Sequence, residues 1–243
     1  MKNIIYKIYL IILIKMAHNL KPIEYSFILL GDSSVGKSSI FSRLQNNSFS
    51  ENPLPTLGIK KLILNFDNIE IDKQKNLYKN FKIILSDTAG QERYKAITKS
   101  YFRGSQGIIL IYSIVDEESF KHIQTWLDSI KESLSDWKRS GYIIMLLGNK
   151  LDITEEHKEK RMIMTEEGEK ICSEKGIYWG GECSAKTFDE NKFKEIFSKL
   201  VKQIYLKLGE KEIIKNENKK QISKLITKKP KKRRGCISII SAE

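Results

Sequence analysis

Cysteine is scarce in this sequence, with only Cys172, Cys183 and Cys236 among its 243 residues. Such a small and odd number argues against the disulfide framework of a secreted protein and favours a reducing compartment. A chain of this length also buries a core that is stable without disulfides. No apolar run reaches the roughly 20 residues that a membrane-spanning helix needs, and no internal repeat occurs. These absences leave an ordinary folded domain as the first expectation.

The proportions of hydrophobic and charged residues agree with such a domain. Hydrophobic residues make up 40% of the chain and charged residues 30%. The net charge is +13, but it is unevenly distributed. Residues 208–243 hold nine lysines and two arginines against four glutamates, a net charge of +7. We therefore expect this charge to determine where the protein goes more than which chemistry it performs.

The two ends of the chain differ from the part between them. Residues 4–14 are almost all apolar, but no small-residue cleavage site follows, as a signal peptide requires. We expect residues 1–23 to be an apolar, irregular extension; either Met16 is the true start, or the extension is a helix on a membrane surface. Residues 225–236 are basic, contain proline and glycine, and show no helical period. We therefore expect one domain at 24–208 and a disordered polybasic tail at 209–243.

Short apolar runs alternate with amphipathic segments inside the expected domain. The runs predict strands at 25–30, 61–66, 81–85, 107–115, 142–147 and 177–183. The amphipathic segments predict helices at 38–45, 117–138, 165–175 and 188–208, and the charged segment 155–161 predicts a loop. This alternation indicates an α/β fold, a mostly parallel sheet with one antiparallel edge strand and helices on both faces. Ligands of such sheets bind at the carboxyl ends of the strands.

The first motif is a phosphate-binding loop. Residues 31–38 (GDSSVGKS) follow a predicted strand and precede a predicted helix, the context that G-x-x-x-x-G-K-[ST] requires. Glycine lets successive backbone N–H groups converge on phosphate oxygens, and the helix N-terminus adds positive potential. Lys37 would contact the β- and γ-phosphates, and Ser38 would bind Mg²⁺. The expected phosphate-binding residues of this loop are Gly31, Asp32, Ser33, Ser34, Val35, Gly36, Lys37, Ser38 and Ser39.

The second motif, residues 87–92 (DTAGQE), follows another predicted strand. Asp87 at the strand end can hold Mg²⁺ through water, and Gly90 can offer its backbone N–H to the γ-phosphate. Gln91 would then be the catalytic residue that orients an attacking water. This positioning role suits phosphoryl transfer, in which catalysis is mostly geometry and charge neutralisation.

The third and fourth motifs predict a guanine site. Asn149, Lys150 and Asp152 follow the strand predicted at 142–147. A carboxylate at Asp152 can accept two hydrogens from the Watson–Crick edge of guanine, and adenine offers no such pair. A site built around this pairing rejects the wrong base by about 10⁴-fold or more. Residues Ser184, Ala185 and Lys186 follow the last predicted strand and would support the base with backbone N–H groups and the lysine stem.

Together, and in this order, the four motifs resemble the nucleotide-binding motifs of Ras-superfamily small GTPases over residues 24–208. Residues 91–94 (QERY), 101–104 (YFRG), 126–127 (WL) and 182–187 (ECSAKT) resemble the Rab branch. The resemblance implies a single P-loop small-GTPase domain. It also implies that Thr56 joins Ser38 on Mg²⁺ and that Phe49 packs edge-on against guanine; a core position for Phe49 is the alternative.

The resemblance further implies two switches, at 52–59 and 90–103, which order around the γ-phosphate and bind an exchange factor, a GTPase-activating protein and effectors. Two positions depart from the Rab pattern. Lys61 and Ser86 stand where Rab proteins usually carry aromatic residues, while Tyr101, the third member of that group, is present. We therefore do not expect partners that read the aromatic trio. The interval between Thr56 and Asp87 is also long, so residues 65–79 should contain an extended hairpin loop.

The C-terminus departs from the Rab pattern as well. Cys236 is followed by ISIISAE, so it does not form a terminal C-a-a-X box. Either Cys236 is a lipid anchor that acts together with the basic run, or it is an unmodified thiol. The basic run suits an anionic membrane surface. Nucleic acid is the alternative partner, which we do not favour because nothing else in the chain resembles a base-reading surface.

These features predict a Rab-like molecular switch that binds GTP or GDP with Mg²⁺ and regulates vesicle-mediated membrane transport. Hydrolysis should be slow, because no arginine finger is evident in the chain and a partner would have to supply it. We expect a monomer in the cytoplasm, peripherally associated with the cytosolic face of an intracellular membrane. The alternatives are a GTP-binding scaffold with little turnover and a Ras- or Rho-like signalling GTPase. His18, His122 and His157 show no ligand spacing and are expected to be surface or packing residues.

Overall fold

The structure is a computed structural model that describes residues 21–54, 56, 58–88, 102, 104–134 and 142–227. For residues 210–227 it describes the helical backbone but not the side chains. The chain divides into two compact units, Met1–Lys207 and Leu208–Glu243. All predicted site residues except Cys236 belong to the first unit.

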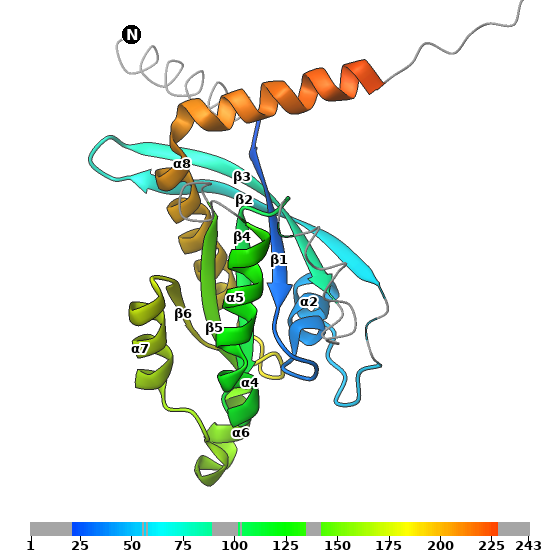
Figure 1. Cartoon of the computed structure of the whole chain (residues 1–243), viewed down its shortest axis with the longest axis vertical. Helices are drawn as coiled ribbons and strands as arrows, with labels where there is room; N and C mark the ends of the chain where they lie inside the picture. The colour runs from blue at the N-terminus through cyan, green and yellow to red at the C-terminus, as the bar shows by residue number, and fades with distance from the viewer. Residues whose placement is uncertain are drawn as a thin grey trace, which may run out of the picture. The chain divides into compact units, whose positions relative to one another are not determined.

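The described residues of the first unit form one six-stranded sheet with the order β2-β3-β1-β4-β5-β6 (Figure 1). Its strands are β1 Ile23–Leu30, β2 Ile59–Asp72, β3 Leu77–Thr88, β4 Gly107–Ser113, β5 Ile143–Asn149 and β6 Tyr178–Glu182. β2 pairs with β3 in the antiparallel direction, and the other four pairs are parallel. Every residue of β4 and β5 is buried, as mostly apolar strands covered on both faces should be. The predicted sheet, with its antiparallel edge strand, is confirmed.

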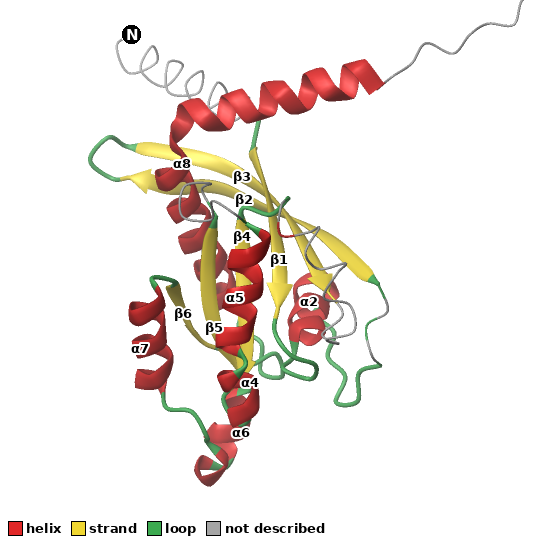
Figure 2. Ribbon diagram, in the orientation of Figure 1, coloured by secondary structure: helices red, strands yellow, loops and turns green. Residues whose placement is uncertain are grey.

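Helices follow the strands as the alternation predicted (Figure 2). They are α2 Lys37–Asn46, α4 Glu117–Lys121, α5 Ile123–Ser133, α6 Leu151–Glu156, α7 Thr165–Lys175 and α8 Glu190–Thr227, with a short 3-10 helix, η2, at Lys158–Lys160. The predicted helix at 165–175 agrees with α7 at both ends. The predicted helix at 117–138 is divided at His122 into α4 and α5, and residues 135–141 lie outside the described residues.

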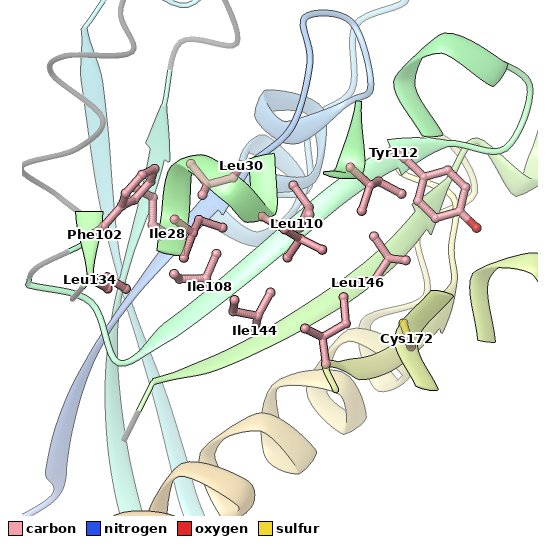
Figure 3. Packing of buried hydrophobic residues seen from close by; sticks show 14 of the residues in the cluster. Ile28, Leu30, Phe102, Ile108, Leu110, Tyr112, Leu134, Ile144, Leu146 and Cys172 are labelled. Atoms are coloured by element: carbon pink, nitrogen blue, oxygen red, sulfur yellow. The ribbon is translucent and has the colours of Figure 1, made fainter. Parts of the chain in front are cut away.

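Helices cover both faces of the sheet because alternate strand residues point to opposite faces. On one face, Ile28 of β1 and Ile108 of β4 share a core cluster with Leu127 of α5 and Cys172 of α7. Figure 3 shows part of this cluster, in which the side chains of Ile28, Ile108 and Ile144 extend from β1, β4 and β5. On the other face, the ring of Phe27 stacks on Phe197 of α8, with centroids 6.0 Å apart. The expectation of helices on both faces is therefore confirmed.

The segment 65–79 is not the extended loop that we expected. β2 and β3 continue as a paired ladder to Asp72 and Leu77, which leaves only residues 73–76 for the turn. The Asp72 carboxylate accepts the N–H groups of Gln74 and Lys75, and Asn76 has a left-handed φ of 50°, which asparagine tolerates. Two register shifts interrupt this ladder, so the period-2 pattern by which a strand is recognised is broken.

Two further elements differ from the expected ones. The predicted loop at 155–161 contains the end of α6 and the 3-10 helix η2. Its glutamates are good helix formers, and Asp152 lies in the first turn of α6, where the helix dipole favours a carboxylate. Helix α8 also continues past its predicted end at Leu208.

Residues 210–227, which we assigned to a disordered tail, are helical in the structure. Gly209 interrupts α8 with non-helical angles (φ 69°, ψ 158°), and the lysine- and glutamate-rich sequence that follows favours a helix again. The predicted extension at 1–20 and the end of the tail at 228–243 lie outside the described residues. Within the described part of the chain, no helix combines the length and the apolar character that crossing a membrane requires.

Candidate nucleotide-binding site

A cavity of about 910 Å³ lies where the first, third and fourth motifs meet, after the carboxyl ends of β1 and β5. The cavity is lined by most of the predicted phosphate- and guanine-binding residues: Ser33, Ser34, Gly36, Lys37, Ser38, Ser39, Phe49, Thr56, Asn149, Lys150, Asp152, Ala185 and Lys186. Segments that are more than a hundred residues apart in sequence thus share one cavity. Its volume is in the range of small-molecule sites in proteins.

The loop between β1 and α2 needs glycine at both ends. Gly31 has a φ of 132°, and a Cβ there would lie 2.1 Å from the carbonyl oxygen of Ile111. Gly36 has a φ of 99°, and a Cβ there would lie 2.1 Å from Nδ2 of Asn149. The loop can therefore pass this close to β4 and to the end of β5 only without side chains at these two positions. Helix α2 then begins at Lys37 with no side-chain cap, so its first N–H groups remain available to an anion.

Lys37 is held inside the loop that precedes it. Its Nζ donates to the carbonyl oxygens of Gly31 (2.9 Å) and Asp32 (2.5 Å), and its side chain is buried. Burial lowers the pKa of Lys37 to about 8, although the carboxylates of Asp87 and Asp32 act in the opposite direction. A buried ammonium group of this kind gains strongly from an added anion, because a phosphate replaces the solvation that burial removed.

Oxygen ligands suitable for a hard cation lie beside Lys37. The hydroxyls of Ser38 and Thr56 are 2.5 Å apart. Asp87, at the end of β3, has no exposed area, and within the described residues neither of its carboxylate oxygens makes a hydrogen bond. Burial raises the pKa of Asp87, and the nearby Lys37 ammonium opposes this shift. Two hydroxyls beside an unsatisfied buried carboxylate fit Mg²⁺, which takes few protein ligands and otherwise binds water and phosphate.

The described residues contain no group of three or more His, Cys, Asp or Glu side chains that could hold a metal ion. The candidate cation site therefore depends on the hydroxyls of Ser38 and Thr56 together with Asp87. Such a set is incomplete without ligands from a bound nucleotide, which agrees with the fit to Mg²⁺ described above.

The base-reading residues are fixed by a hydrogen-bond network. Nδ2 of Asn149 donates to the carbonyl oxygen of Val35 (2.8 Å), and its Oδ1 accepts the N–H of Ala185 (3.1 Å). The Ser184 hydroxyl lies 2.5 Å from Oδ1 of Asp152. Because this hydroxyl also accepts the N–H groups of residues 186 and 187, it donates its own hydrogen to Asp152. Asn149 thus connects the phosphate loop to the loop at 184–186, and Ser184 orients the carboxylate.

Two other predicted guanine residues border the same region. Lys150 has a left-handed backbone (φ 73°), and burial lowers the pKa of its ammonium group. Phe49 is half-buried and lines the cavity, so it is not the core residue of our alternative. The guanidinium carbon of Arg43 lies 5.3 Å from the centroid of the Phe49 ring.

Three of the described residues that were predicted to bind phosphate do not line the cavity. These are Gly31, Asp32 and Val35, of which Val35 is buried in the core. The Asp32 carboxylate instead accepts hydrogen bonds from Nε1 of Trp126 (2.8 Å) and lies 2.5 Å from Nδ1 of His122. The hydrogen bond to Asp32 raises the pKa of His122. His122 is on the surface, as expected, but it also anchors the phosphate loop, which no sequence signal indicated.

Some predicted residues lie outside the described residues. These are Gly90 and Gln91 with most of the second switch, Tyr101, and the candidate lipid anchor Cys236. Of the two positions that depart from the Rab pattern, Lys61 on β2 lies opposite Ser86 on β3. The two substitutions thus fall side by side on one patch of the sheet.

Comparison with known proteins settles the family. The Ras family model matches residues 26–206, which is most of the chain. The chain belongs to the Ras family. It is 38% identical over 212 residues to the Ras-related protein Rab-13 of Bos taurus, covering 87% of this chain and 95% of that protein. It is also 34% identical over 197 residues to the Ras-related protein RabC of Dictyostelium discoideum, covering 81% and 92%.

A third relative, the Ras-related protein Rab-8B of Pongo abelii, is 38% identical over 194 residues, covering 79% of this chain and 84% of that protein. The resemblance to Rab-branch small GTPases that the motifs predicted is thus confirmed, and this Ras-family protein is a GTPase. The matched residues 26–206 include all four motifs and the whole sheet apart from the first three residues of β1.

Proposed function

We propose that this Ras-family protein is a Rab-like switch that binds GTP or GDP with Mg²⁺, hydrolyses GTP slowly and regulates membrane traffic. The observation that carries the proposal is the single cavity in which the phosphate loop, Asn149, Asp152 and the loop at 184–186 converge. A nucleotide has an anionic end and a base end, and the cavity offers a cation and helix N–H groups at one side and the carboxylate of Asp152 at the other.

At the phosphate end, the residues act by position and charge. Lys37 and the N–H groups at the start of α2 bind the phosphates, together with the backbone of residues 31–36. Ser38, Thr56 and Asp87 are the residues that would hold Mg²⁺. When bound, Mg²⁺ neutralises charge on the β- and γ-phosphates, which is its usual contribution to phosphoryl transfer. We assign Gln91 the orientation of the attacking water, with Gly90 donating to the γ-phosphate.

At the base end, Asp152 selects guanine. The Ser184 hydroxyl donates to Oδ1 of Asp152 and so keeps the carboxylate plane fixed. A fixed carboxylate accepts the two hydrogens on the Watson–Crick edge of guanine and leaves adenine unpaired, which is a strong basis for discrimination. Lys150, Phe49 and the loop at 184–186 enclose the base.

The two ends of the chain would determine location. We propose that residues 209–243 bring the protein to an anionic membrane surface on the cytosolic side, and that Cys236 adds a lipid chain if it is modified. Exchange factor, activating protein and effectors would bind at the switches, 52–59 and 90–103. The domain at 24–208 would act as a monomer.

The test is calorimetry of nucleotide binding to the purified protein and to its Asp152→Asn variant. We expect GDP to bind the wild type far more tightly than ADP. The variant should lose affinity for GDP and gain affinity for xanthosine diphosphate, because an amide N–H₂ can donate to the 2-oxo group of xanthine. Absence of heat with GDP, or equal affinity for ADP and GDP, would contradict the proposed function.

A further inference from the structure

Arg43 does not line the cavity, yet its guanidinium group contacts several parts of the base end. Nε donates to the carbonyl oxygen of Ala185 (2.8 Å), and Nη2 donates to that of Lys186 (2.6 Å). The remaining terminal nitrogen, Nη1, donates to the carbonyl oxygen (2.9 Å) and to Oδ1 (3.1 Å) of Asn47. Asn47 is the C-cap of α2, so one side chain ties the end of this helix to the loop at 184–186.

This contact is suited to arginine. A guanidinium group has five donors in a fixed plane, whereas a lysine ammonium is a single point on a flexible stem. Nε and Nη2, which lie on one edge of the guanidinium plane, donate hydrogen bonds to two adjacent carbonyl groups. The guanidinium carbon also lies 5.3 Å from the centroid of the Phe49 ring. Arg43 therefore contacts Phe49 as well as the loop.

The loop that Arg43 holds is the one that orients both base-reading side chains. The hydroxyl of Ser184 donates to Asp152, and the N–H of Ala185 donates to Asn149. Arg43 donates hydrogen bonds to the carbonyl groups of Ala185 and Lys186, which follow Ser184. A displacement of these carbonyl groups would move the Ser184 hydroxyl and the Ala185 N–H together, and the two side chains would lose their fixed orientation.

We propose that Arg43 is a positioning residue that sets the preference of the site for guanine, by holding the loop at 184–186 against the end of α2. This inference rests on the proposed function, since it assigns Asp152 and Asn149 to the base. Arg43 acts through other residues and does not touch the nucleotide. Its removal should therefore weaken selection of the base more than binding of the phosphates.

The experiment compares GDP with IDP, which differs from GDP only by lacking the 2-amino group on the base. Affinities for both are measured by calorimetry for the wild type, Arg43→Lys and Arg43→Gln. We expect the variants to bind GDP up to about tenfold more weakly, because Asp152 and Asn149 are no longer held in the orientation that binds the base. The preference for GDP over IDP should fall by at least about threefold, because a loosely held Asp152 gains less from the 2-amino group.

Asn47→Gly is the matched control. It removes only Oδ1 of Asn47 from the contacts of Arg43 and suits the left-handed φ of 55° at this position. We expect its preference for GDP over IDP to stay within about twofold of the wild type. The inference is overturned if Arg43→Lys keeps the wild-type preference, whether its GDP affinity falls or not, because a merely structural role would weaken both nucleotides equally. Failure of the wild type to bind GDP would instead contradict the proposed function.

Discussion

Lys37 is the residue whose charge state is most strongly tied to ligand binding. Its ammonium group has a pKa of about 8 because burial opposes the charge. Bound phosphates favour the charged form, so the pKa of Lys37 must rise when a nucleotide binds. Below about pH 8 the free protein already carries this proton, and above that pH binding must take it up from solution.

We therefore predict that the affinity for GDP falls as the pH rises through the pKa of free Lys37. Calorimetry in two buffers of different ionisation enthalpy measures the protons taken up per nucleotide. Uptake should increase between about pH 7.5 and about pH 9 and approach one proton. In Lys37→Arg, which stays charged throughout this range, the residual binding should show less uptake. Equal uptake at both pH values in the wild type would contradict the prediction.

Gln91 is the residue to which we assign the attacking water. Gln91→Leu keeps the size of the side chain but removes both groups that can orient water. We predict that hydrolysis of GTP in a single turnover slows by at least about tenfold while the affinity for GTP stays unchanged. Identical single-turnover rates in the two proteins would remove Gln91 from this role.

Sequence reasoning predicted those residues of the site that act within a local motif. Lys37, Ser38, Asn149 and Asp152 stand at fixed spacings beside glycine or after a strand, and the cavity contains all four. Contacts between distant segments could not be predicted in this way. Arg43 and Ala185 are 142 positions apart, so no spacing in the sequence links them.

Among the elements, the first part of α8 packs aromatic side chains against the sheet. Phe197 is almost fully buried, with its ring 6.0 Å from that of Phe27 and 5.9 Å from that of Phe66. We predict that Phe197→Ala lowers the free energy of unfolding by about 3–5 kcal/mol, because it removes this packing and leaves a cavity.

Urea unfolding in saturating GDP measures this difference. Leu206→Ala is the matched control, since Leu206 lies on the same helix but is 56% exposed. We expect this control to change the free energy of unfolding by no more than about 0.5 kcal/mol. A comparable loss in both variants would show that Phe197 owes its effect to the helix itself and not to the aromatic contacts.

The elements that were predicted well are those with an unbroken period. The continuous apolar runs of β4 and β5 and the period of α7 gave these elements within two residues at either end. The strand pair at 61–66 and 81–85 was predicted, but the outer part of the β2–β3 hairpin was expected to be a loop, because its two register shifts disturb the alternation of apolar residues and its polar composition is typical of loops. For this hairpin, an interrupted pattern accounts for the error.

For the whole molecule, the distribution of charge is the feature with the clearest consequence. Six cations, Lys228, Lys229, Lys231, Lys232, Arg233 and Arg234, precede Cys236. Each contributes about 1 kcal/mol to binding at an anionic membrane surface. We predict that changing all six to glutamine abolishes binding to vesicles that contain phosphatidylserine, in sedimentation at physiological salt, and leaves the affinity for GDP unchanged.

The control changes six exposed lysines of the first unit to glutamine: Lys73, Lys75, Lys158, Lys160, Lys170 and Lys199. The net charge of this variant equals that of the tail variant. We expect it to bind the vesicles nearly as well as the wild type does. An equal loss in both variants would mean that overall charge, and not the basic run, attracts the membrane.

For the first unit, the gathering of the motifs at one edge of the sheet could be predicted, since each motif comes at the end of a strand and the strand ends of a parallel sheet lie together. The second unit was harder to predict. The sequence after Leu208 lacks the apolar stripe that reveals a packed helix, yet its backbone is helical to Thr227. Helix propensity alone, without a regular apolar pattern, gives only a weak sequence signal for a helix.

The tight approach of Gly36 to Asn149 has a consequence for any attempt to redesign this protein. A single methyl group at Gly36 would lie 2.1 Å from Nδ2 of Asn149. One added carbon would therefore disturb both the loop proposed to bind the phosphates and the asparagine proposed to help bind the base. Redesign of either half of the proposed pocket must allow for the other.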